Sequence, residues 1–336
     1  MIFALLLFMS GSSSAARSTA PAADLYSIAA DGSDQHNLTN TPGVSEDLLS
    51  RSPDGGELAF VRGESLVVAG VDGQGLRRLA AFSRDDNFAD PPAWSPSGRR
   101  LAYAQGFSCT GARCYSQQVW VADVESGSTR RLLTKAVEPA WSPNGSRLAF
   151  TRARLTTVGR AQGYRLSVIV ARADGSNQRT PADTASDPAW SPSGRLLAFS
   201  GIRGLVRSRL NGRGRRVLTA RPRKPISEWI SDVSNIAWSP DGRLIAFTGF
   251  TLKGGDGVYV IRLDGRGLLH LGPGSLLTPV SWSPDGKTLV WPHPTRHSLI
   301  VASAGGRGKR EIRVDVTTRV TGAVWSADGS RIFFVG

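Results

Sequence analysis

The sequence predicts an all-β fold, a seven-bladed β-propeller of four-stranded antiparallel blades, from three observations. A motif close to Trp-Ser-Pro-Asp-Gly, followed by an apolar run, recurs along the chain. Its opening serines, 43 to 49 residues apart, are Ser52, Ser95, Ser142, Ser191, Ser239, Ser283 and Ser326. A period in the forties with strand signals is typical of one propeller blade per repeat. The third observation is that the chain begins and ends with complementary half repeats.

Each repeat divides into two hairpins. In the first, Ser-Pro-Asp-Gly forms a four-residue turn, because Pro presets φ at the second position and Gly accepts the conformation that the fourth position requires. The segments on either side, such as PAW and RLLAF within residues 188–199, are predicted strands A and B. In the second hairpin, a strand C such as VYVIRL (258–263) reaches a glycine-containing turn and continues as strand D.

The half repeats at the two ends predict how the ring closes. Seven first halves are present, but only six second halves follow them. The missing second half is DLYSIAADGSDQHNLTN, residues 24–40, and the chain stops after the last first half with Val335 and Gly336. We expect the N-terminal strands to complete the C-terminal blade, because closure removes the exposed sheet edges of an open row. Residues 24–336 then form a single domain.

The repeated residues are interpreted as structural. Tryptophan on the innermost strand fills the wedge between blades, and each buried side chain contributes about 2–3 kcal/mol. These residues are Trp94, Trp141, Trp190, Trp238, Trp282 and Trp325. Arg51 takes this place in the first repeat and predicts a weaker or more polar interface there. The turn aspartates supply one residue per loop, whereas calcium needs six or more converging oxygens, so we interpret them as turn residues. They are Asp54, Asp241, Asp285 and Asp328.

These motifs resemble the TolB-type, WD40-like propeller repeat, with aromatic-Ser-Pro-Asp-Gly, Leu-Ala-Phe, Asp-Gly and a closing Arg-Arg-Leu-Thr. The resemblance covers roughly residues 24–336, and it implies the fold but no particular function. Relatives include the propeller of TolB and the propeller domains of prolyl-oligopeptidase-like hydrolases. TolB carries an additional N-terminal α/β domain, for which this sequence has no room, so a role in the Tol–Pal envelope system is not implied.

The N-terminus indicates export. Residues 2–9 are an apolar run, and Ser14-Ala15-Ala16 resembles a cleavage site, so residues 1–23 are interpreted as a signal peptide or a weak N-terminal anchor with a short linker. The expected location is periplasmic or secreted. Cys109 and Cys114, the only cysteines, suit a disulfide within one short loop of an exported protein, with a pair of free thiols as the alternative.

The formal net charge of +14 invites an acidic partner or nucleic acid. Much of that charge, however, falls on basic pairs in the predicted strand D, where charged edges prevent sheet-to-sheet aggregation. These pairs are Arg77-Arg78, Arg130-Arg131, Arg215-Arg216 and Lys309-Arg310. A charge spread around the rim favours a protein partner over nucleic acid.

The irregular connections all belong to one predicted face, formed by the B–C and D–A loops. Binding residues tend to occupy loops held by a rigid scaffold, so we expect a partner there, chiefly on loops 151–165 and 220–235. The candidate residues are Arg152, Arg154, Arg160, Arg221, Arg223, Lys224 and Trp229. Solvated loops, with Trp229 folded onto its blade, are the alternative. Loop 82–92 adds Asp85, Asp86 and Asp90, and a face of mixed sign favours a protein, with an acidic glycan as the second class.

Enzyme signals are sparse. The chain has no Gly-x-Ser-x-Gly elbow. The loop HPTRH holds His293 and His297, which suggest a metal-dependent polysaccharide lyase as the alternative function, since oligogalacturonate lyases use a propeller of this kind. Two histidines without a third ligand are weak evidence for a metal. We therefore expect an exported, monomeric, non-catalytic binding propeller without a cofactor.

Overall fold

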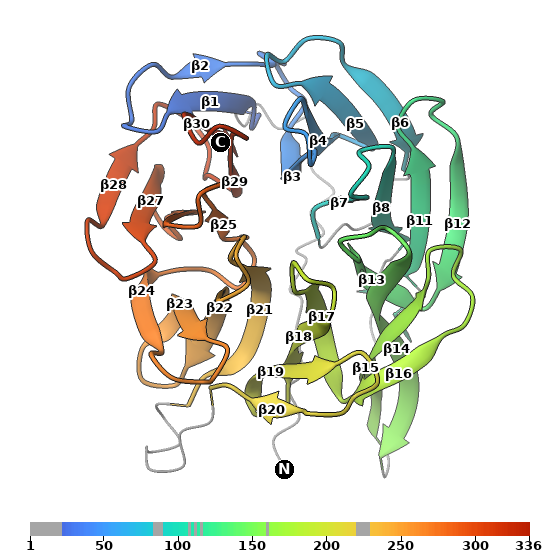
Figure 1. Ribbon diagram of the computed structural model, residues 1–336. Coiled ribbons are helices and arrows are strands. Elements are labelled where there is room, and N and C mark those ends of the chain that lie inside the picture. Colours follow the sequence, from blue (N-terminus) through green and yellow to red (C-terminus); the bar gives the residue numbers. More distant parts are fainter. Residues whose placement is uncertain are drawn as a thin grey trace.

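The computed structural model describes residues 22–82, 90–106, 109–110, 113–114, 117–158, 161–219 and 229–336. They form seven four-stranded antiparallel sheets and one small two-stranded hairpin, and none of them is helical. The sheets are arranged as blades around a ring (Figure 1). The predicted seven-bladed propeller is confirmed.

Blades 1 to 4 follow the first complete repeats, and the hairpin β9–β10 is inserted in blade 2. The strands are given from the innermost outward. Blade 1 consists of β3 (Glu46–Arg51), β4 (Glu57–Arg62), β5 (Ser65–Gly70) and β6 (Arg77–Ala81), and blade 2 of β7 (Ala93–Trp94), β8 (Arg100–Gln105), β11 (Gln118–Asp123) and β12 (Thr129–Thr134), with the hairpin β9 (Cys109–Thr110) and β10 (Arg113–Cys114). Blade 3 consists of β13 (Ala136–Trp141), β14 (Arg147–Val158), β15 (Ala161–Arg172) and β16 (Arg179–Asp183), and blade 4 of β17 (Ala185–Trp190), β18 (Leu196–Gly201), β19 (Gly204–Arg209) and β20 (Arg216–Val217).

Blades 5 to 7 complete the ring. Again from the innermost strand outward, blade 5 consists of β21 (Ser231–Trp238), β22 (Leu244–Thr251), β23 (Gly255–Arg262) and β24 (Leu269–Pro273). Blade 6 consists of β25 (Ser281–Trp282), β26 (Thr288–Pro292), β27 (Ser298–Ser303) and β28 (Arg310–Arg313). Blade 7 consists of β29 (Gly322–Trp325), β30 (Arg331–Val335), β1 (Leu25–Ala29) and β2 (His36–Asn37).

Blade 7 joins the two ends of the chain, as predicted. Its strand order is β2-β1-β30-β29, and β1 pairs with β30 from Leu25↔Val335 to Ala29↔Arg331. Asp24 and Gly336 exchange two backbone hydrogen bonds of 3.1 Å, with each N–H donating to the carbonyl oxygen of the other residue. In Figure 1 the blue strand β1 lies beside the red strand β30.

A polar network connects the closing segment to blade 1. The buried side chain of Glu46 accepts hydrogen bonds from Thr39 Oγ1 at 2.9 Å and Thr41 Oγ1 at 3.4 Å. Thr41 also donates its N–H and its hydroxyl to Asp24 Oδ1, at 2.9 and 3.0 Å. Burial raises the pKa of Glu46 to about 7, although the Thr39 hydrogen bond lowers it. The network therefore links blade 7 to the first strand of blade 1.

The hydrophobic core consists of seven clusters, and each is shared by two neighbouring blades. Aromatic side chains on the second strand of each blade are the largest contributors and are almost completely buried. They are Phe60, Tyr103, Phe150, Phe199, Phe247, Trp291 and Phe334. Each blade packs only against its neighbours, so the stability of the ring depends on every interface being present.

The repeated tryptophans pack between blades, as interpreted, and some also form hydrogen bonds there. Trp141, Trp190 and Trp325 are buried, and the other three are half-buried. Three of the indoles donate Nε1–H to a carbonyl of the preceding blade: Trp190 to Ala140 at 3.0 Å, Trp238 to Ala189 at 3.2 Å and Trp282 to Ala237 at 3.0 Å. The side chains therefore stabilise each blade interface by packing and, in these cases, by polar contact.

Arg51 departs from this pattern at the interface between blades 7 and 1. Its guanidinium is partly buried, and Nη1 donates to the carbonyl of Ser52 in its own turn at 3.2 Å. Burial lowers the pKa of Arg51, because the charged form loses solvation. The partners described for Arg51 belong to its own turn, and a guanidinium in this place is expected to contribute less than an indole, so the weaker interface stays a prediction.

We predict that Arg51→Trp raises the free energy of unfolding by about 1–2 kcal/mol, because it replaces a desolvated charge with buried apolar area. Urea denaturation monitored by circular dichroism measures the change. Arg51→Ala is the matched control, since it removes the charge without filling the interface. A variant Arg51→Trp no more stable than Arg51→Ala would contradict the prediction.

The Ser-Pro-Asp-Gly turns are built in the same way in all seven blades. The buried serine Oγ accepts the backbone N–H five residues later, as Ser326 does from Arg331 at 2.9 Å. The same hydroxyl donates to Asp328 Oδ1 at 2.6 Å, and this hydrogen bond is the main reason why the pKa of Asp328 falls to about 2. The equivalent serine bonds are those of Ser52, Ser95, Ser142, Ser191, Ser239 and Ser283. These contacts confirm that the aspartates are turn residues.

Candidate binding face

The two faces of the propeller carry different connections. The A–B and C–D turns lie on one face, here called the turn face, and the B–C and D–A connections lie on the opposite loop face. Seven large hydrophobic side chains of the described residues are exposed, and only Leu76 belongs to the turn face. The six on the loop face are Val44, Leu155, Tyr164, Ile202, Leu252 and Leu277. Single exposed apolar residues are common, but their segregation to one side marks a candidate docking surface.

The turn face has one opening in an otherwise continuous ring of turns. In six of the seven Ser-Pro-Asp-Gly-type turns, a Cβ added to the glycine would contact the proline or alanine of the same turn in the preceding blade. Gly145, for example, would meet Pro96 at 3.6 Å. Gly98, between blades 1 and 2, has no atom within 4 Å of that position. The resulting hollow of about 220 Å³ includes Ser52, Glu57, Arg77, Gly98 and Glu125 in its lining.

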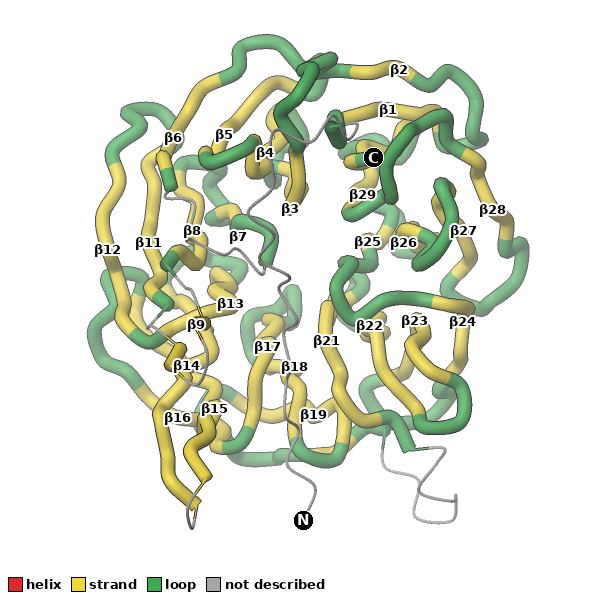
Figure 2. The backbone as a smooth tube through the Cα atoms, turned by 180° about the vertical axis from the view of Figure 1, so that it is seen from behind, coloured by secondary structure: helices red, strands yellow, loops and turns green. Residues whose placement is uncertain are grey.

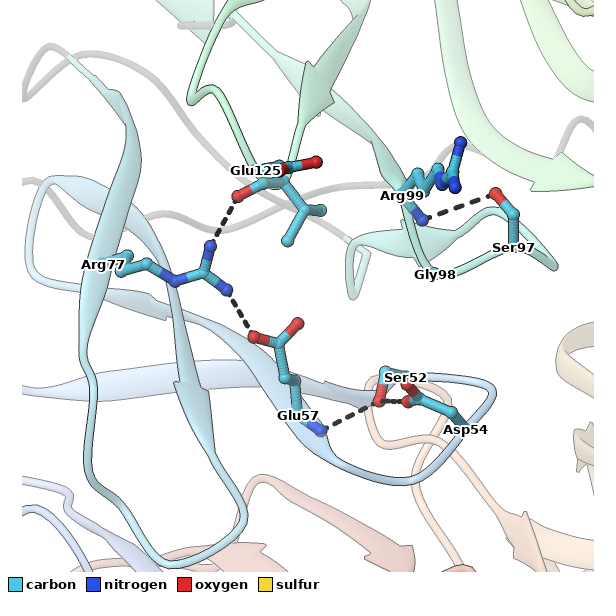
Figure 3. A pocket seen from close by; sticks show the side chains of 9 residues that line it. Ser52, Asp54, Glu57, Arg77, Ser97, Gly98, Arg99 and Glu125 are labelled. Carbon is cyan, nitrogen blue, oxygen red and sulfur yellow. Dashed lines mark hydrogen bonds and ion pairs between the residues drawn. The ribbon is translucent and has the colours of Figure 1, made fainter.

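Several polar groups of this hollow have partners within the fold. Arg77 pairs with Glu57 through Nη2 and donates from Nη1 to the carbonyl of Val124 at 2.8 Å, so it bridges blades 1 and 2 (Figure 3). Ser52 Oγ donates to Asp54 at 2.6 Å within the turn. The hollow is therefore explained by the repeat geometry, and Ser52, Glu57 and Arg77 in its lining already have partners within the fold.

The predicted irregular loop 151–165 is a regular hairpin, so that prediction was wrong. Strands β14 and β15 are twelve residues each and pair continuously from Arg147↔Arg172 to Val158↔Ala161. The neighbouring strands cover only part of this length. The pairing of β13 with β14 reaches as far as Arg152 of β14, and the pairing of β16 with β15 begins at Ser167 of β15. The outer part of the hairpin, residues 153–158 and 161–166, is here called the arm, and it projects beyond the ring in both views (Figures 1 and 2).

Two predicted contact residues, Arg152 and Arg154, lie at the base of the arm. Arg152 stacks over Phe150, 5.3 Å from the ring centroid, and donates to Gln178 Oε1 at 2.6 Å. Burial lowers the pKa of Arg152, and the positive charge of Arg154 lowers it further. Arg154 is exposed and is the register partner of Arg165. Positive charge therefore gathers on this hairpin without a carboxylate partner among the described residues.

The other predicted residues are not all placed by the structure. Arg160, Arg221, Arg223 and Lys224, with Asp85 and Asp86, lie outside the described residues. Trp229 is partly buried and precedes β21 of blade 5, two blades away from the arm. Cys109 and Cys114 are register partners in the hairpin β9–β10, while their side chains lie outside the description. The disulfide stays a prediction, for which directly opposed backbone positions are suitable.

The histidine loop connects β26 to β27 on the loop face of blade 6. His293 Nδ1 accepts the N–H of Thr295 at 3.2 Å, and burial lowers its pKa. His297 is exposed beside a hollow of about 560 Å³ that is also lined by Arg296, Glu311 and Arg313. Arg296 pairs with Glu311 at 2.9 Å across this loop.

A metal at this loop would need further ligands. In the part of the chain that the structure describes, no group of three or more His, Cys, Asp or Glu side chains is placed to hold a metal ion. His293 and His297 therefore have no third ligand there, and two histidines alone do not define a metal site.

A cluster of carboxylates lies on the inner strands of blades 2 to 4. This inner carboxylate cluster consists of Asp90, just before β7, Glu138 in β13 and Asp187 in β17. The Asp187 N–H donates to Glu138 Oε2 at 2.5 Å, and the Thr151 hydroxyl donates to the same oxygen. Glu138 and Asp187 lie at β-bulges with positive φ of 53° and 54°. A left-handed backbone at a non-glycine residue is costly, so packing between the blades must hold it in place.

The cluster is electrostatically unfavourable when fully ionised. Burial raises the pKa of Asp90 to about 7, with the charge of Glu138 as the next cause. Burial also raises the pKa of Glu138, and it raises that of Asp187 well above its usual range, where both other carboxylates add to the rise. Each residue as a whole keeps some exposure, but the Oδ2 atoms of Asp90 and Asp187 are buried without a hydrogen-bond partner among the described residues.

Sequence reasoning placed Asp90 on the loop face and did not identify Glu138 or Asp187 as part of a site. The available signal was an acidic residue shortly before Ala-Trp in three successive repeats, in ADPPAW, VEPAW and SDPAW. Because strand A enters the ring at this point, the three blades bring together carboxylates that are 48 and 49 residues apart in sequence.

Six of the eight basic residues of the predicted pairs lie in the outermost strands, whereas Arg215 and Lys309 directly precede theirs. Two of the six also connect blades. Arg77, in β6, reaches the carbonyl of Val124 in blade 2. Arg310, in β28, donates to the carbonyls of Asp31 and Ala30 in blade 7. The rim charge is therefore partly structural, which supports the interpretation that net charge alone does not indicate a nucleic-acid surface.

Neither a scan against protein-family models nor a search of curated protein sequences found a match. Solved structures share the fold. TolB from Acinetobacter baumannii has a TM-score of 0.55 at 18% identity, covering 87% of this chain and 63% of that chain. An oligogalacturonate lyase from Vibrio parahaemolyticus gives 0.64 at 12% identity, covering 94% and 96% of the two chains. A puromycin hydrolase mutant in complex with PGG gives 0.62 at 16% identity, covering 88% and 51%.

At these identities the comparisons establish the fold and not the activity. The chain has a TolB-like propeller fold, which confirms the resemblance inferred from the repeats. The similar structures also include that of a hydrolase with a propeller. In the part of the chain that is described, no helix is long and apolar enough to cross a membrane.

Proposed function

We propose that the protein is an extracytoplasmic, non-catalytic binding propeller whose loop face docks a protein partner. The N-terminal apolar segment supports export. The loop face combines exposed hydrophobic side chains with exposed arginines, a combination that suits a protein more than a polyanion. The ring supplies a rigid frame for this surface.

One observation carries the proposal. Six of the seven exposed large hydrophobic side chains of the described residues lie on the loop face, and the turn face carries one. The turn face is occupied by repeated turns whose polar groups bond to one another, as the Ser326–Asp328 pair does at 2.6 Å. A surface on which most of the exposed apolar side chains lie on one side is typical of a docking site.

The proposal predicts that Ile202→Ser, Leu252→Ser and Leu277→Ser together reduce partner capture from a native envelope extract by about tenfold or more, since apolar anchors contribute most of the binding energy. The measurement is quantitative mass spectrometry of proteins retained on the immobilised propeller, wild type against variant. Circular dichroism confirms that the exposed substitutions leave the fold intact.

Leu76→Ser is the matched control, because it removes a similar exposed side chain from the turn face. It should leave the captured set unchanged. The proposal is wrong if the triple variant retains its partner, or if Leu76→Ser loses the same partner to the same extent.

A further inference from the structure

The arm has a free backbone edge. The outermost register pair of β13 with β14 is Ala136↔Arg152, and Ala153 donates its N–H to the carbonyl of Lys135, just before β13, at 3.2 Å. Backbone groups two residues apart point to the same side of a strand, so those of Leu155 and Thr157 face the same edge beyond the end of β13. No strand of the described residues pairs with that edge. Unpaired edges of this kind accept an additional strand.

The two sides of the arm differ in chemistry. Arg154 and Arg165 are directly opposed in register and therefore share one side, where like charges destabilise the pair. Leu155 and Tyr164 are opposed on the other side, and their relative exposures are 61% and 46%. Leu155 therefore leaves most of its apolar surface in water on one side of the ribbon, while the other side carries the two arginines.

The charge of the hairpin restricts what can occupy this edge. The sequence has no Asp or Glu from residue 139 to residue 173, and the stretch contains six arginines. They are Arg147, Arg152, Arg154, Arg160, Arg165 and Arg172. A second copy of the arm would bring like charges together, which costs free energy. A chain that carries carboxylates would instead be attracted.

We propose that the arm captures an extended acidic segment of a protein, which adds as a strand along the outer edge of β14. The incoming backbone pairs with Leu155 and Thr157, and its carboxylates lie against Arg154 and Arg165. Main-chain hydrogen bonds then give affinity, and alternate side chains give specificity. The inference rests on the proposed function and names the chemistry of the segment that the loop face receives.

The test uses a fluorescent ten-residue peptide that alternates Glu and Val, titrated against the full chain by fluorescence anisotropy. We expect Arg154→Gln with Arg165→Gln to weaken binding by about tenfold or more, because charge-assisted contacts are lost. Two further peptides carry N-methyl groups on alternate residues, one on the odd-numbered and the other on the even-numbered residues. The peptide that loses the N–H groups that pair with β14 should not bind. Hydrogen exchange at Leu155 and Thr157 should slow when the unmodified peptide binds.

Arg209→Gln with Arg213→Gln is the matched control, because it removes two exposed charges from the turn face of blade 4. This pair should change peptide affinity less than about twofold. The strand-addition proposal is overturned if both N-methylated peptides bind as well as the parent. It is also overturned if the control pair has the same effect as the arm pair.

Two further measurements separate the alternatives. If a mixed-sequence DNA duplex protects the arm and competes with the peptide at lower concentration, the arm is a nucleic-acid element and the proposal is wrong. If the peptide does not bind, while the loop-face variant at Ile202, Leu252 and Leu277 still loses its envelope partner, the arm proposal fails and the proposed function stands.

Discussion

Removal of residues 1–40 is expected to abolish cooperative folding of the propeller. The deletion removes β1 and β2, and with them the buried side chains of Leu25 and Ile28 and five backbone pairs with β30. A ring that is held by contacts between neighbours then has one incomplete blade and an open edge. Since a domain of this kind is stable by only about 5–15 kcal/mol, this loss is sufficient to unfold it. Differential scanning calorimetry should show no native transition.

A milder variant keeps this prediction measurable if the deletion cannot be purified. Leu25→Ala and Ile28→Ala should each cost about 2–5 kcal/mol in the free energy of unfolding, because both leave a cavity between β1 and its neighbours. Leu277→Ala is the control, since its side chain is exposed and should change stability by less than about 0.5 kcal/mol. A deletion protein with the transition temperature of the full chain would show that closure does not stabilise the ring.

The sequence was sufficient to predict the blades and the way in which they close. The repeat period is a property of the chain alone, and the turn chemistry of Ser-Pro-Asp-Gly fixes one hairpin per copy. The complementary half repeats at residues 24–40 and 322–334 predicted the pairing of β1 with β30, which the structure confirms. These features were predictable because local turns and a regular period determine them.

The arm could not be predicted from the repeat, because its residues extend past the point where strand B of the blade is complete. The stretch TRARLTTVGRAQGYRL carries Thr, Val, Tyr and Leu in strand-like positions, but it follows a complete strand B and was interpreted as a loop. The structure continues β14 and β15 in one register from the blade into the arm. A pattern that lacks alternation of buried and polar residues does not distinguish an exposed ribbon from an irregular loop.

The inner carboxylate cluster was missed for a different reason. Asp90, Glu138 and Asp187 belong to three separate repeats, and each looks like an ordinary residue before a strand. Their interaction depends on the curvature of the ring and on bulges in β13 and β17 that no local motif specifies. Long-range electrostatic contacts of this kind become visible only when the blades are assembled.

The cluster predicts that the wild-type protein loses stability as the pH rises from about 4 to 8. Asp90, with a pKa of about 7, holds its proton in the folded state after the unfolded chain has released it near pH 4. The folded state therefore binds more protons in this window, and the free energy of unfolding falls with rising pH. The raised pKa values of Asp187 and Glu138 act in the same direction.

Asp90→Asn with Asp187→Asn should be about 2 kcal/mol more stable than wild type at pH 8 and little different at pH 4, because amides retain an acceptor oxygen and remove two like charges. Urea denaturation at both pH values measures the difference. Asp256→Asn, an exposed change, should keep the wild-type profile. Glu46, whose pKa is also raised by burial, contributes equally to wild type and variant, so it cancels in the comparison. If the double variant retains the full wild-type pH dependence, then the three carboxylates do not interact across the blades.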